Sequence, residues 1–451
     1  MAANKNFENN IINNIADESL RKAIKEHSFS KREGINQFEN IEIVKKVAKN
    51  SKWEITERLD HYLELFEKNF ELQGGRVLWA EDDKDALHYI YQIIKEQNAK
   101  NIVKTKSSTL NEIGLKSYLT KNEIHVQETE IGELILEELN LESNHITNSL
   151  NDILESKVLH LWKKGVEKNT LSGINELFPL IKNKSILADI SITGANFLLA
   201  KEGKVLLSEN EGNIRFASSF SKTHIVVVGI DKILSSIHDL PLFLPLLASY
   251  NNGQKMTVHN SLIGGPRKRG ENDGPERMVV ILLDNKRSEL LSKEFREALY
   301  CINCGSCINV CPVYQNIGGL AYEAPYSGPI GSVISPHLKG VYDYGHLSFA
   351  STLCGACTKN CPINIQIDTL LAKNRKLYIN YGYGTWSEKI KMQLFRSAMN
   401  HPFVIKIPNK WMKEWLYQRI FADRWEKGRS AIQFSETPFY KLYKKSNFNK
   451  K

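Results

Sequence analysis

Seven cysteines, confined to residues 301–361, are the residues whose type and spacing most directly predict chemistry. The first motif reads Cys301-Ile-Asn-Cys304-Gly-Ser-Cys307-Ile-Asn-Val-Cys311-Pro312. This is the C-x2-C-x2-C-x3-C-P pattern that binds [4Fe–4S] clusters. The second motif, Cys354-Gly-Ala-Cys357-Thr-Lys-Asn-Cys361-Pro362, repeats the pattern with Ser351 in the place of its first cysteine. An odd number of closely spaced thiols favours metal binding over a disulfide framework.

In this pattern the first three thiolates bind one cluster, and the fourth cysteine, next to proline, binds the other. The spacing therefore predicts two [4Fe–4S] clusters. The predicted ligands of the first cluster are Cys301, Cys304, Cys307 and Cys361. The predicted ligands of the second cluster are Cys311, Cys354 and Cys357. Zinc also binds thiolates, but structural zinc sites usually pair two C-x2-C units, which would leave both x3-C-P ends unexplained.

The second cluster lacks one thiolate from this chain, and several interpretations of the gap are open. The Ser351 oxygen could bind the remaining iron. A partner protein or water could supply the ligand, or the cluster could be of the [3Fe–4S] type. Ser351 could also serve only as a helix cap. The sequence alone does not choose among them.

The hydrophobic pattern predicts four regions that must position these motifs. Residues 1–70 have apolar residues three and four apart, which is typical of helices, and residues 71–294 alternate short β-rich runs with helical runs. That alternation predicts an α/β domain with a mostly parallel sheet. Strands are predicted at 76–80, 101–105, 124–127, 223–230 and 278–283, helices at 82–95 and 109–119, and a hairpin at 196–200 and 205–207. Residues 295–380 hold the cysteines, and residues 386–451 form a basic, Trp-rich region.

The charge of the chain is unevenly distributed. The whole sequence has 60 Lys and Arg against 51 Asp and Glu, whereas residues 373–451 have 18 against 5. Such a basic segment predicts docking on an acidic partner protein, with peripheral contact to an anionic membrane as the weaker option. Trp411 and Trp415 lie four residues apart, on one face of a helix predicted at 409–421. Packing on the cysteine-bearing region would explain these tryptophans.

Several classes of protein are excluded by what the sequence lacks. The longest apolar stretch, residues 240–250, contains two prolines and is shorter than the roughly 20 residues of a membrane span. The N-terminus shows no secretory signal, so the protein is predicted to be cytoplasmic. No dinucleotide or P-loop phosphate motif is present. The absence of a DNA-reading motif disfavours nucleic acid as a partner, and with it a redox-sensing regulator.

Several segments carry a close resemblance to a known family. They are residues 104–108 (Lys-Thr-Lys-Ser-Ser), 128–133, 188–196, 209–213 (Glu-Asn-Glu-Gly-Asn), 274–276, 301–319 and 328–331. Over nearly its whole length the sequence resembles the lactate utilization protein B family, iron–sulfur proteins of bacterial lactate oxidation. The resemblance implies a CoA-transferase-like α/β domain, an α-helical dicluster ferredoxin module and a small C-terminal domain. It also implies two partners, lactate utilization proteins A and C, which together with this chain would oxidise L-lactate to pyruvate.

The α/β domain has weaker candidates for a site of its own. Glu209 and Glu211 lie on either side of Asn210, just before Gly212. In CoA-transferase-like folds a glutamate can act as a nucleophile, so both are candidate catalytic residues. We favour the alternative, a turn whose carboxylates bind neighbouring backbone. Residues 105–108 open a helix after a strand, where anions bind, although an ordinary N-cap explains them as well.

The chain thus has motifs for electron transfer but no recognisable hydride-accepting site. It is best interpreted as an iron–sulfur electron-transfer component of an L-lactate-oxidising system, in which partners perform at least part of the substrate chemistry. One alternative is a catalytic subunit with its own substrate pocket near residues 210–212. Another is an iron–sulfur subunit for a different 2-hydroxy acid, such as glycolate.

Overall fold

The fold is described from a computed structural model of the chain. It describes residues 18–138, 182–183, 185–292 and 294–383, and in the tail residues 386, 390, 393–394, 396–397, 400–401, 410–420, 433–437 and 439–448. The chain forms two compact units, Met1–Tyr378 and Ile379–Lys451. No helix among the described residues is long and apolar enough to cross a bilayer.

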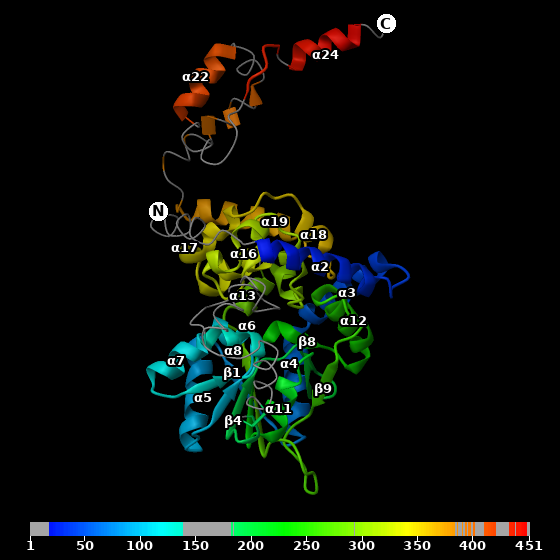
Figure 1. Ribbon diagram of the computed structural model, residues 1–451, viewed down its shortest axis with the longest axis vertical. Helices are drawn as coiled ribbons and strands as arrows, with labels where there is room; N and C mark the ends of the chain where they lie inside the picture. The colour runs from blue at the N-terminus through cyan, green and yellow to red at the C-terminus, as the bar shows by residue number, and fades with distance from the viewer. Residues whose placement is uncertain are drawn as a thin grey trace, which may run out of the picture. The chain divides into compact units, whose positions relative to one another are not determined.

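A six-stranded, wholly parallel sheet lies in the first unit (Figure 1). Its strands, in spatial order, are β1 (Arg76–Ala80), β10 (Arg277–Leu283), β7 (Thr223–Gly229), β4 (Ile190–Thr193), β2 (Ile102–Lys104) and β3 (Val126–Glu128). β7 is buried along its whole length, and β10 is buried after its first residue. Continuous apolar runs produce such strands because both faces of the sheet are covered. The predicted parallel α/β sheet is therefore confirmed.

Helices of the α/β region pack around this sheet (Figure 1). They are α5 (Asp83–Glu96), α6 (Ser108–Glu112), α7 (Leu115–Lys121), α8 (Ile131–Glu138) and α11 (Asn213–Phe220). The predicted helix at 82–95 is confirmed, with Asp82 as its N-cap. The single helix predicted at 109–119 is wrong, because the chain breaks at Gly114, whose φ of 67° is left-handed. Only glycine adopts that conformation without strain, so it separates α6 from α7.

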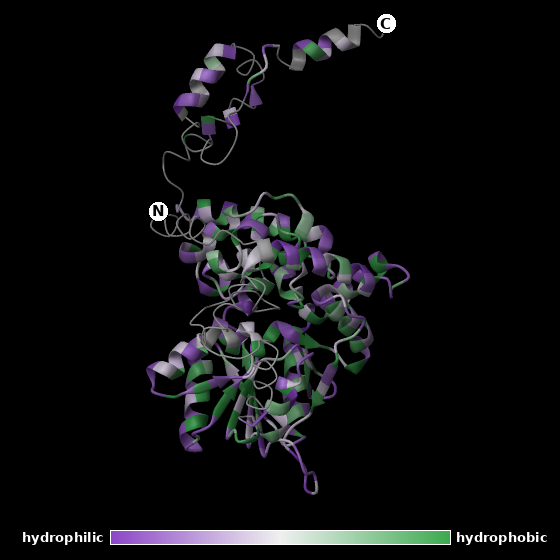
Figure 2. Ribbon diagram, in the orientation of Figure 1, coloured by the Kyte–Doolittle hydropathy of each residue, from purple (hydrophilic) through white to green (hydrophobic). Residues whose placement is uncertain are grey.

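A second, four-stranded sheet lies beside the first. Its spatial order is β8 (Ile233–Leu234), β5 (Phe197–Leu199), β6 (Lys204–Glu209) and β9 (His259–Ile263). β5 and β6 pair antiparallel, which confirms the predicted hairpin. Figure 2 shows that the strands of both sheets are rich in apolar residues, and these residues belong to two separate hydrophobic clusters.

The N-terminal helices and the cysteine-bearing region share one continuous hydrophobic core with the second sheet. The N-terminal helices are α2 (Glu18–Ile35), α3 (Ile41–Glu57) and α4 (Leu59–Glu71). The segment from the end of β7 to the cysteines also contains η2 (Ile230–Lys232), η3 (Ile237–Asp239), α12 (Leu240–Asn251) and α13 (Arg287–Leu291). Helix α2 contacts α12 and two short helices, one within the first cysteine motif (Ser306–Asn309) and one just after it (Tyr314–Ile317). Sequence-distant helices therefore enclose the cysteines.

The cysteine-bearing region contains only short helices and turns among its described residues. They are η4 (Arg296–Tyr300), α14 (Ser306–Asn309), α15 (Tyr314–Ile317), η5 (Leu320–Tyr322), α16 (Gly328–Lys339), α17 (Val341–Tyr344), η6 (Gly345–Phe349), α18 (Ala356–Asn360) and α19 (Ile367–Asn380). Helices α14 and α18, one from each cysteine motif, contact each other directly. This contact brings the two motifs together.

The second unit contains α22 (Lys410–Ile420) and α24 (Phe439–Phe448). The helix predicted at 409–421 is confirmed as α22. Trp411 and Trp415 are 71% and 50% exposed, and the Arg419 guanidinium lies 5.5 Å from the Trp415 ring centroid. Packing of these tryptophans on the cysteine-bearing region stays a prediction, because that region belongs to the other unit. Trp425 and the basic residues at 421–430 lie outside the described residues.

Candidate iron–sulfur centre and the adjoining polar pocket

Four cysteines, three from the first motif and one from the second, line a single pocket. They are Cys301, Cys304, Cys307 and Cys361. The rest of the lining is mainly apolar and includes Ile302, Ile330, Ile363, Ile365 and Ile367. Three of the thiols are buried, and that of Cys301 is half-buried. The structure thus gathers the four thiols that the spacing assigned to the first cluster.

The backbone explains how short cysteine spacings converge on one point. Asn303, just before Cys304, has a left-handed φ of 56°, and Gly305, just after it, has a φ of 69°. These two reversals turn the chain around Cys304 before α14 begins. The Asn360 side-chain amide then donates to the Ser306 carbonyl at 2.8 Å and its hydroxyl at 2.6 Å, which ties α18 to α14.

The chemistry of these thiols fits an iron–sulfur cluster. Burial raises the pKa of Cys301, Cys304 and Cys307, and it raises that of Cys361 to about 12. A buried thiol of this kind stays protonated at neutral pH and is a poor nucleophile. A bound metal centre instead deprotonates it outright. The pocket therefore fits metal ligation and does not fit a nucleophilic cysteine.

A mononuclear zinc site fits the geometry less well. Across the described residues, no three His, Cys, Asp or Glu side chains converge as the ligands of one metal ion would. Zinc needs its thiolates within about 2.3 Å of one point. The four thiols line one mainly apolar pocket, and a set of four cysteines with this spacing is typical of a [4Fe–4S] cluster.

The second motif repeats the backbone of the first but lies closer to the surface. Leu353 and Gly355, on either side of Cys354, have φ values of 52° and 74°. Cys354 is exposed, and a hydrogen bond from the Ala356 backbone lowers its pKa. Cys311 and Cys357 are buried. Burial raises the pKa of both, that of Cys357 to about 11.

Ser351 takes the place that Cys301 occupies in the first motif. The Leu353 backbone N–H donates to the Ser351 hydroxyl oxygen at 3.1 Å, just as the Asn303 N–H donates to the Cys301 sulfur at 3.4 Å. Arg375 donates to the Ser351 carbonyl at 2.6 Å and fixes this turn. The hydroxyl is therefore at the position of an eighth cysteine, and it accepts a hydrogen bond within the turn.

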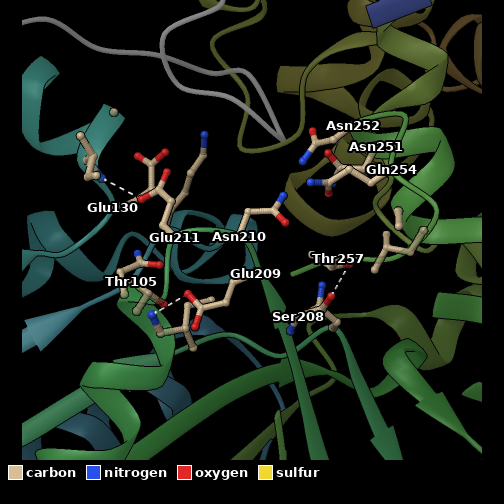
Figure 3. Close-up of a pocket in the computed structure, with 18 residues that line it drawn as sticks. Thr105, Glu130, Ser208, Glu209, Asn210, Glu211, Asn251, Asn252, Gln254 and Thr257 are labelled. Atoms are coloured by element: carbon tan, nitrogen blue, oxygen red, sulfur yellow. Dashed lines mark hydrogen bonds between the residues drawn. The ribbon is translucent and has the colours of Figure 1, made fainter. Parts of the chain in front are cut away.

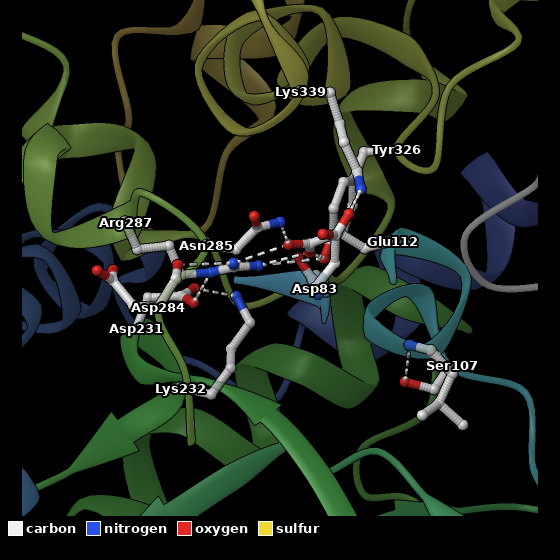
Figure 4. A network of polar contacts seen from close by, with 12 residues as sticks. Asp83, Ser107, Glu112, Asp231, Lys232, Asp284, Asn285, Arg287, Tyr326 and Lys339 are labelled. Atoms are coloured by element: carbon white, nitrogen blue, oxygen red, sulfur yellow. Dashed lines mark hydrogen bonds and ion pairs between the residues drawn. The ribbon is translucent and has the colours of Figure 1, made fainter. Parts of the chain in front are cut away.

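A buried ionic network joins the α/β region to the cysteine-bearing region (Figure 4). Arg287 binds both oxygens of Glu112, at 2.9 and 2.6 Å, and its Nε donates to Asp231 at 2.8 Å. The Tyr326 hydroxyl donates to Glu112 at 2.6 Å. Burial opposes ionisation of Asp231, but the charges of Lys232 and Arg287 lower its pKa to about 2. The network is fully paired, as buried charges must be.

This network reaches the first cysteine motif through Lys232, and Lys52 joins it at Asp231. Lys232 donates to the Asp231 carboxylate at 2.5 Å and to the Cys301 carbonyl at 2.6 Å. Lys52 is fully buried and donates to the Asp231 carbonyl at 2.7 Å, and burial lowers its pKa to about 8. Sequence analysis identified none of these residues, because their partners lie far away along the chain.

A polar pocket of about 520 Å³ lies at the carboxyl ends of β2 and β3 and beside β6 (Figure 3). This volume is in the range of small-molecule sites. Glu209 lines it, but its carboxylate accepts hydrogen bonds from the backbone of Ile214 and Arg215, at 2.8 and 2.7 Å. Glu211 accepts one from the Ile131 N–H at 3.3 Å. Glu209 thus has the contacts of a turn-stabilising carboxylate.

Glu130 is a pocket residue that sequence analysis missed. Burial raises its pKa to about 7, against the opposing charge of Lys106 and with a further contribution from Glu211. A carboxyl with such a pKa can exchange protons near neutral pH. One signal in the sequence could have revealed it: β2 and β3 are parallel neighbours, so the residues that follow Lys104 and Glu128 meet at one edge of the sheet.

Comparison with known proteins agrees with this architecture. Residues 63–283 match the LUD domain, and residues 297–365 match the 4Fe-4S dicluster domain. The fold and the cysteine site thus define an iron–sulfur protein in which an α/β LUD domain is joined to a dicluster module.

Relatives that match most of the chain give the family. Lactate utilization protein B of Bacillus velezensis is 36% identical over 392 residues, which cover 86% of this chain and 82% of the relative. That of Bacillus subtilis is 35% identical over 415 residues, covering 90% and 87%. The uncharacterized electron transport protein YkgF of Escherichia coli K12 is 33% identical over 417 residues, covering 90% and 87%. The chain belongs to the lactate utilization protein B family.

Proposed function

We propose that this protein is an iron–sulfur electron-transfer component of a cytoplasmic system that oxidises L-lactate to pyruvate. The observation that carries the proposal is the single buried pocket lined by Cys301, Cys304, Cys307 and Cys361. The names of its relatives, which refer to lactate utilization and electron transport, support the pathway.

The proposed ligands follow the crossed pattern of the two motifs. The first [4Fe–4S] cluster is held by the four thiols of the buried pocket. The second is held by Cys311, Cys354 and Cys357, and Ser351 is the candidate for the remaining ligand. When bound, such clusters accept and release single electrons. The protein contributes an apolar enclosure for the first site and a surface position for the second.

Metal content tests this assignment most directly. Anaerobically purified protein should contain about seven to eight irons, with matching sulfide and charge-transfer absorption. Stoichiometric zinc without that absorption would exclude the proposal. The substrate is tested in cells: a deletion strain should fail to grow on L-lactate as sole carbon source but grow on glycolate. The opposite pattern would identify a different 2-hydroxy acid.

The basic tail is the proposed docking site for the partners, lactate utilization proteins A and C. Residues 373–451 carry 18 Lys and Arg against 5 Asp and Glu, and self-repulsion of this kind is relieved by an acidic surface. The exposed Trp411 and Trp415 of α22 supply apolar contact area. Truncation after Tyr383 should leave iron content unchanged and abolish co-purification with the partners.

The salt dependence of association with the partners distinguishes docking through the basic tail from other modes of binding. Association should weaken as salt is raised, because exposed charges are screened beyond about 10 Å at 0.1 M ionic strength. Salt-insensitive association, or a complete complex formed by the truncated chain, would contradict tail docking. Binding to anionic vesicles instead of the partners would favour a membrane role.

A second candidate function is catalysis in the α/β domain, which the family resemblance describes as CoA-transferase-like. The polar pocket beside Glu209 and Glu211 supports it. A nucleophilic glutamate would form an anhydride with an acyl-CoA, so hydroxylamine trapping followed by mass spectrometry should label it. Because the Glu209 carboxylate is occupied by backbone hydrogen bonds, Glu211 is the better position to examine.

A further inference from the structure

A second cavity, of about 210 Å³, adjoins the polar pocket and ends at the first cysteine motif. The two share Thr105, Lys106, Asn196, Ser208 and Asn251 as lining residues. The far end of the smaller cavity is lined by Ile302 and Asn303, the two residues between Cys301 and Cys304. A molecule in this cavity would therefore contact the loop that carries the buried thiols.

The side chains around the smaller cavity suit an anion. Two lysines line it, Lys106 and Lys232, and no Asp or Glu does. The other polar lining residues are Thr105, Ser107, Ser108, Thr109, Asn196, Ser208, Asn251 and Asn303. Hydroxyl, amide and ammonium groups all donate hydrogen bonds, and charged donors bind carboxylates most strongly. The neighbouring pocket has the opposite character, since Glu130, Glu209 and Glu211 line it.

One hydrogen-bond donor in the cavity, the Thr105 hydroxyl, has no hydrogen-bond partner among the described residues. The Thr105 side chain is 1% exposed, and its hydroxyl makes no hydrogen bond to any described group. Thr105 lines the larger pocket, where Figure 3 shows it, and it also lines the smaller cavity. A buried hydroxyl without a partner costs stability, and proteins retain such groups where a ligand or water pairs with them.

We propose that the smaller cavity binds a small carboxylate with an adjacent hydroxyl or oxo group, that is, a 2-hydroxy or 2-oxo acid. Lys106 and the Thr105 hydroxyl hold the carboxylate, and the ligand's hydroxyl faces the carboxylates of the larger pocket. The volume of about 210 Å³ admits a three-carbon acid and falls below the usual range for nucleotide-sized ligands. The choice of acid rests on the proposed function, whereas the anion-binding character rests on the lining.

Calorimetric titration of the full-length, cluster-containing protein under anaerobic conditions tests the proposal. L-lactate should bind, and L-lactamide, which has the same shape without the charge, should bind about tenfold more weakly or worse. Lys106→Met should weaken lactate binding by about tenfold, because it removes one charged donor. Lys121→Met, which replaces an exposed lysine at the end of α7 away from the lining, should leave binding unchanged.

Thr105→Val separates a ligand-binding role from a structural one. Without ligand, the variant should unfold at a higher temperature than the wild type, because the unpaired hydroxyl is gone. Its affinity for lactate should fall nevertheless. Equal binding of lactate and lactamide, or a Lys106→Met variant with unchanged affinity, would overturn the inference, and tighter binding of inorganic phosphate would overturn the choice of acid. Iron and sulfide are measured on the same samples: intact clusters without lactate binding refute only this inference, whereas missing clusters refute the proposed function.

Discussion

The two cysteine motifs have nearly the same backbone and very different surroundings. Each places a left-handed residue before its central cysteine and a left-handed glycine after it, at Asn303 and Gly305 in the first and at Leu353 and Gly355 in the second. The first motif lies under helices and an ionic network, and its thiols line an apolar pocket. The second exposes Cys354 and has a serine in the remaining position.

This difference shows that spacing determines the local turn, whereas the surrounding fold determines what the turn is used for. The thiols of the first motif are buried or half-buried, and Ile302 and Asn303 between them line a polar cavity of the α/β region. In the second motif Cys354 is exposed at the surface.

The largest expected effect comes from removing one thiol of each site. Cys304→Ala should lose the buried cluster and Cys357→Ala the exposed one, so each variant should retain about half of the iron. Electron paramagnetic resonance of the reduced proteins should show that a different signal is missing in each. Loss of the same signal in both variants would disprove the crossed assignment of ligands.

The ionic network, which contacts the first motif through Lys232, gives the next largest effect. Arg287→Met leaves Glu112 buried without a charged partner and removes one of the two cations paired with Asp231, so it should lower the free energy of unfolding in urea by about 3–5 kcal/mol. The matched control is Arg267→Met, which breaks an exposed pair with Glu276 and should cost less than about 1 kcal/mol. Equal losses in the two variants would mean that the network does not stabilise the junction.

Ser351→Cys should make the exposed motif resemble the buried one. Its sulfur would lie where the Cys301 sulfur lies in the first motif, and an added thiolate charge should lower the reduction potential of the second cluster. A redox titration should show this shift with the first cluster unchanged. Thr352→Cys, one residue out of register, is the control. An unchanged potential in Ser351→Cys would restrict Ser351 to its hydrogen bond with Leu353.

The smallest effect concerns Glu130, which lines the polar pocket of the α/β region. Its pKa rises from 4.5 to about 7 on folding, so the folded protein binds the extra proton and stability falls as pH rises between these values. Glu130→Gln should remove that loss and gain about 1–2 kcal/mol near pH 8, with little gain near pH 5. Chemical denaturation at both pH values checks this. An equal gain in the free energy of unfolding at pH 5 and pH 8 would exclude titration of Glu130 in this range. The control is Glu123→Gln, which changes an exposed glutamate.

The sequence predicted those features that depend on local pattern. The apolar runs of β7 and β10, the hairpin of β5 and β6 and the two cysteine turns are all local, and the structure contains them. The ionic network could not be predicted from the sequence, because Glu112 and Arg287 are 175 residues apart and nothing near either residue indicates its partner. The raised pKa of Glu130 depends on burial, which arises only when β3, β6 and α8 meet.

The contacts of the first motif also set how much of the chain must be present before its native surroundings can form. Lys232 donates to the Cys301 carbonyl, and the adjacent Asp231 accepts hydrogen bonds from Lys52 and Arg287. Helix α2 contacts α14, and α14 contacts α18 of the second motif. Segments from the N-terminal helices to the second motif therefore have to be present together before the first motif has its native neighbours.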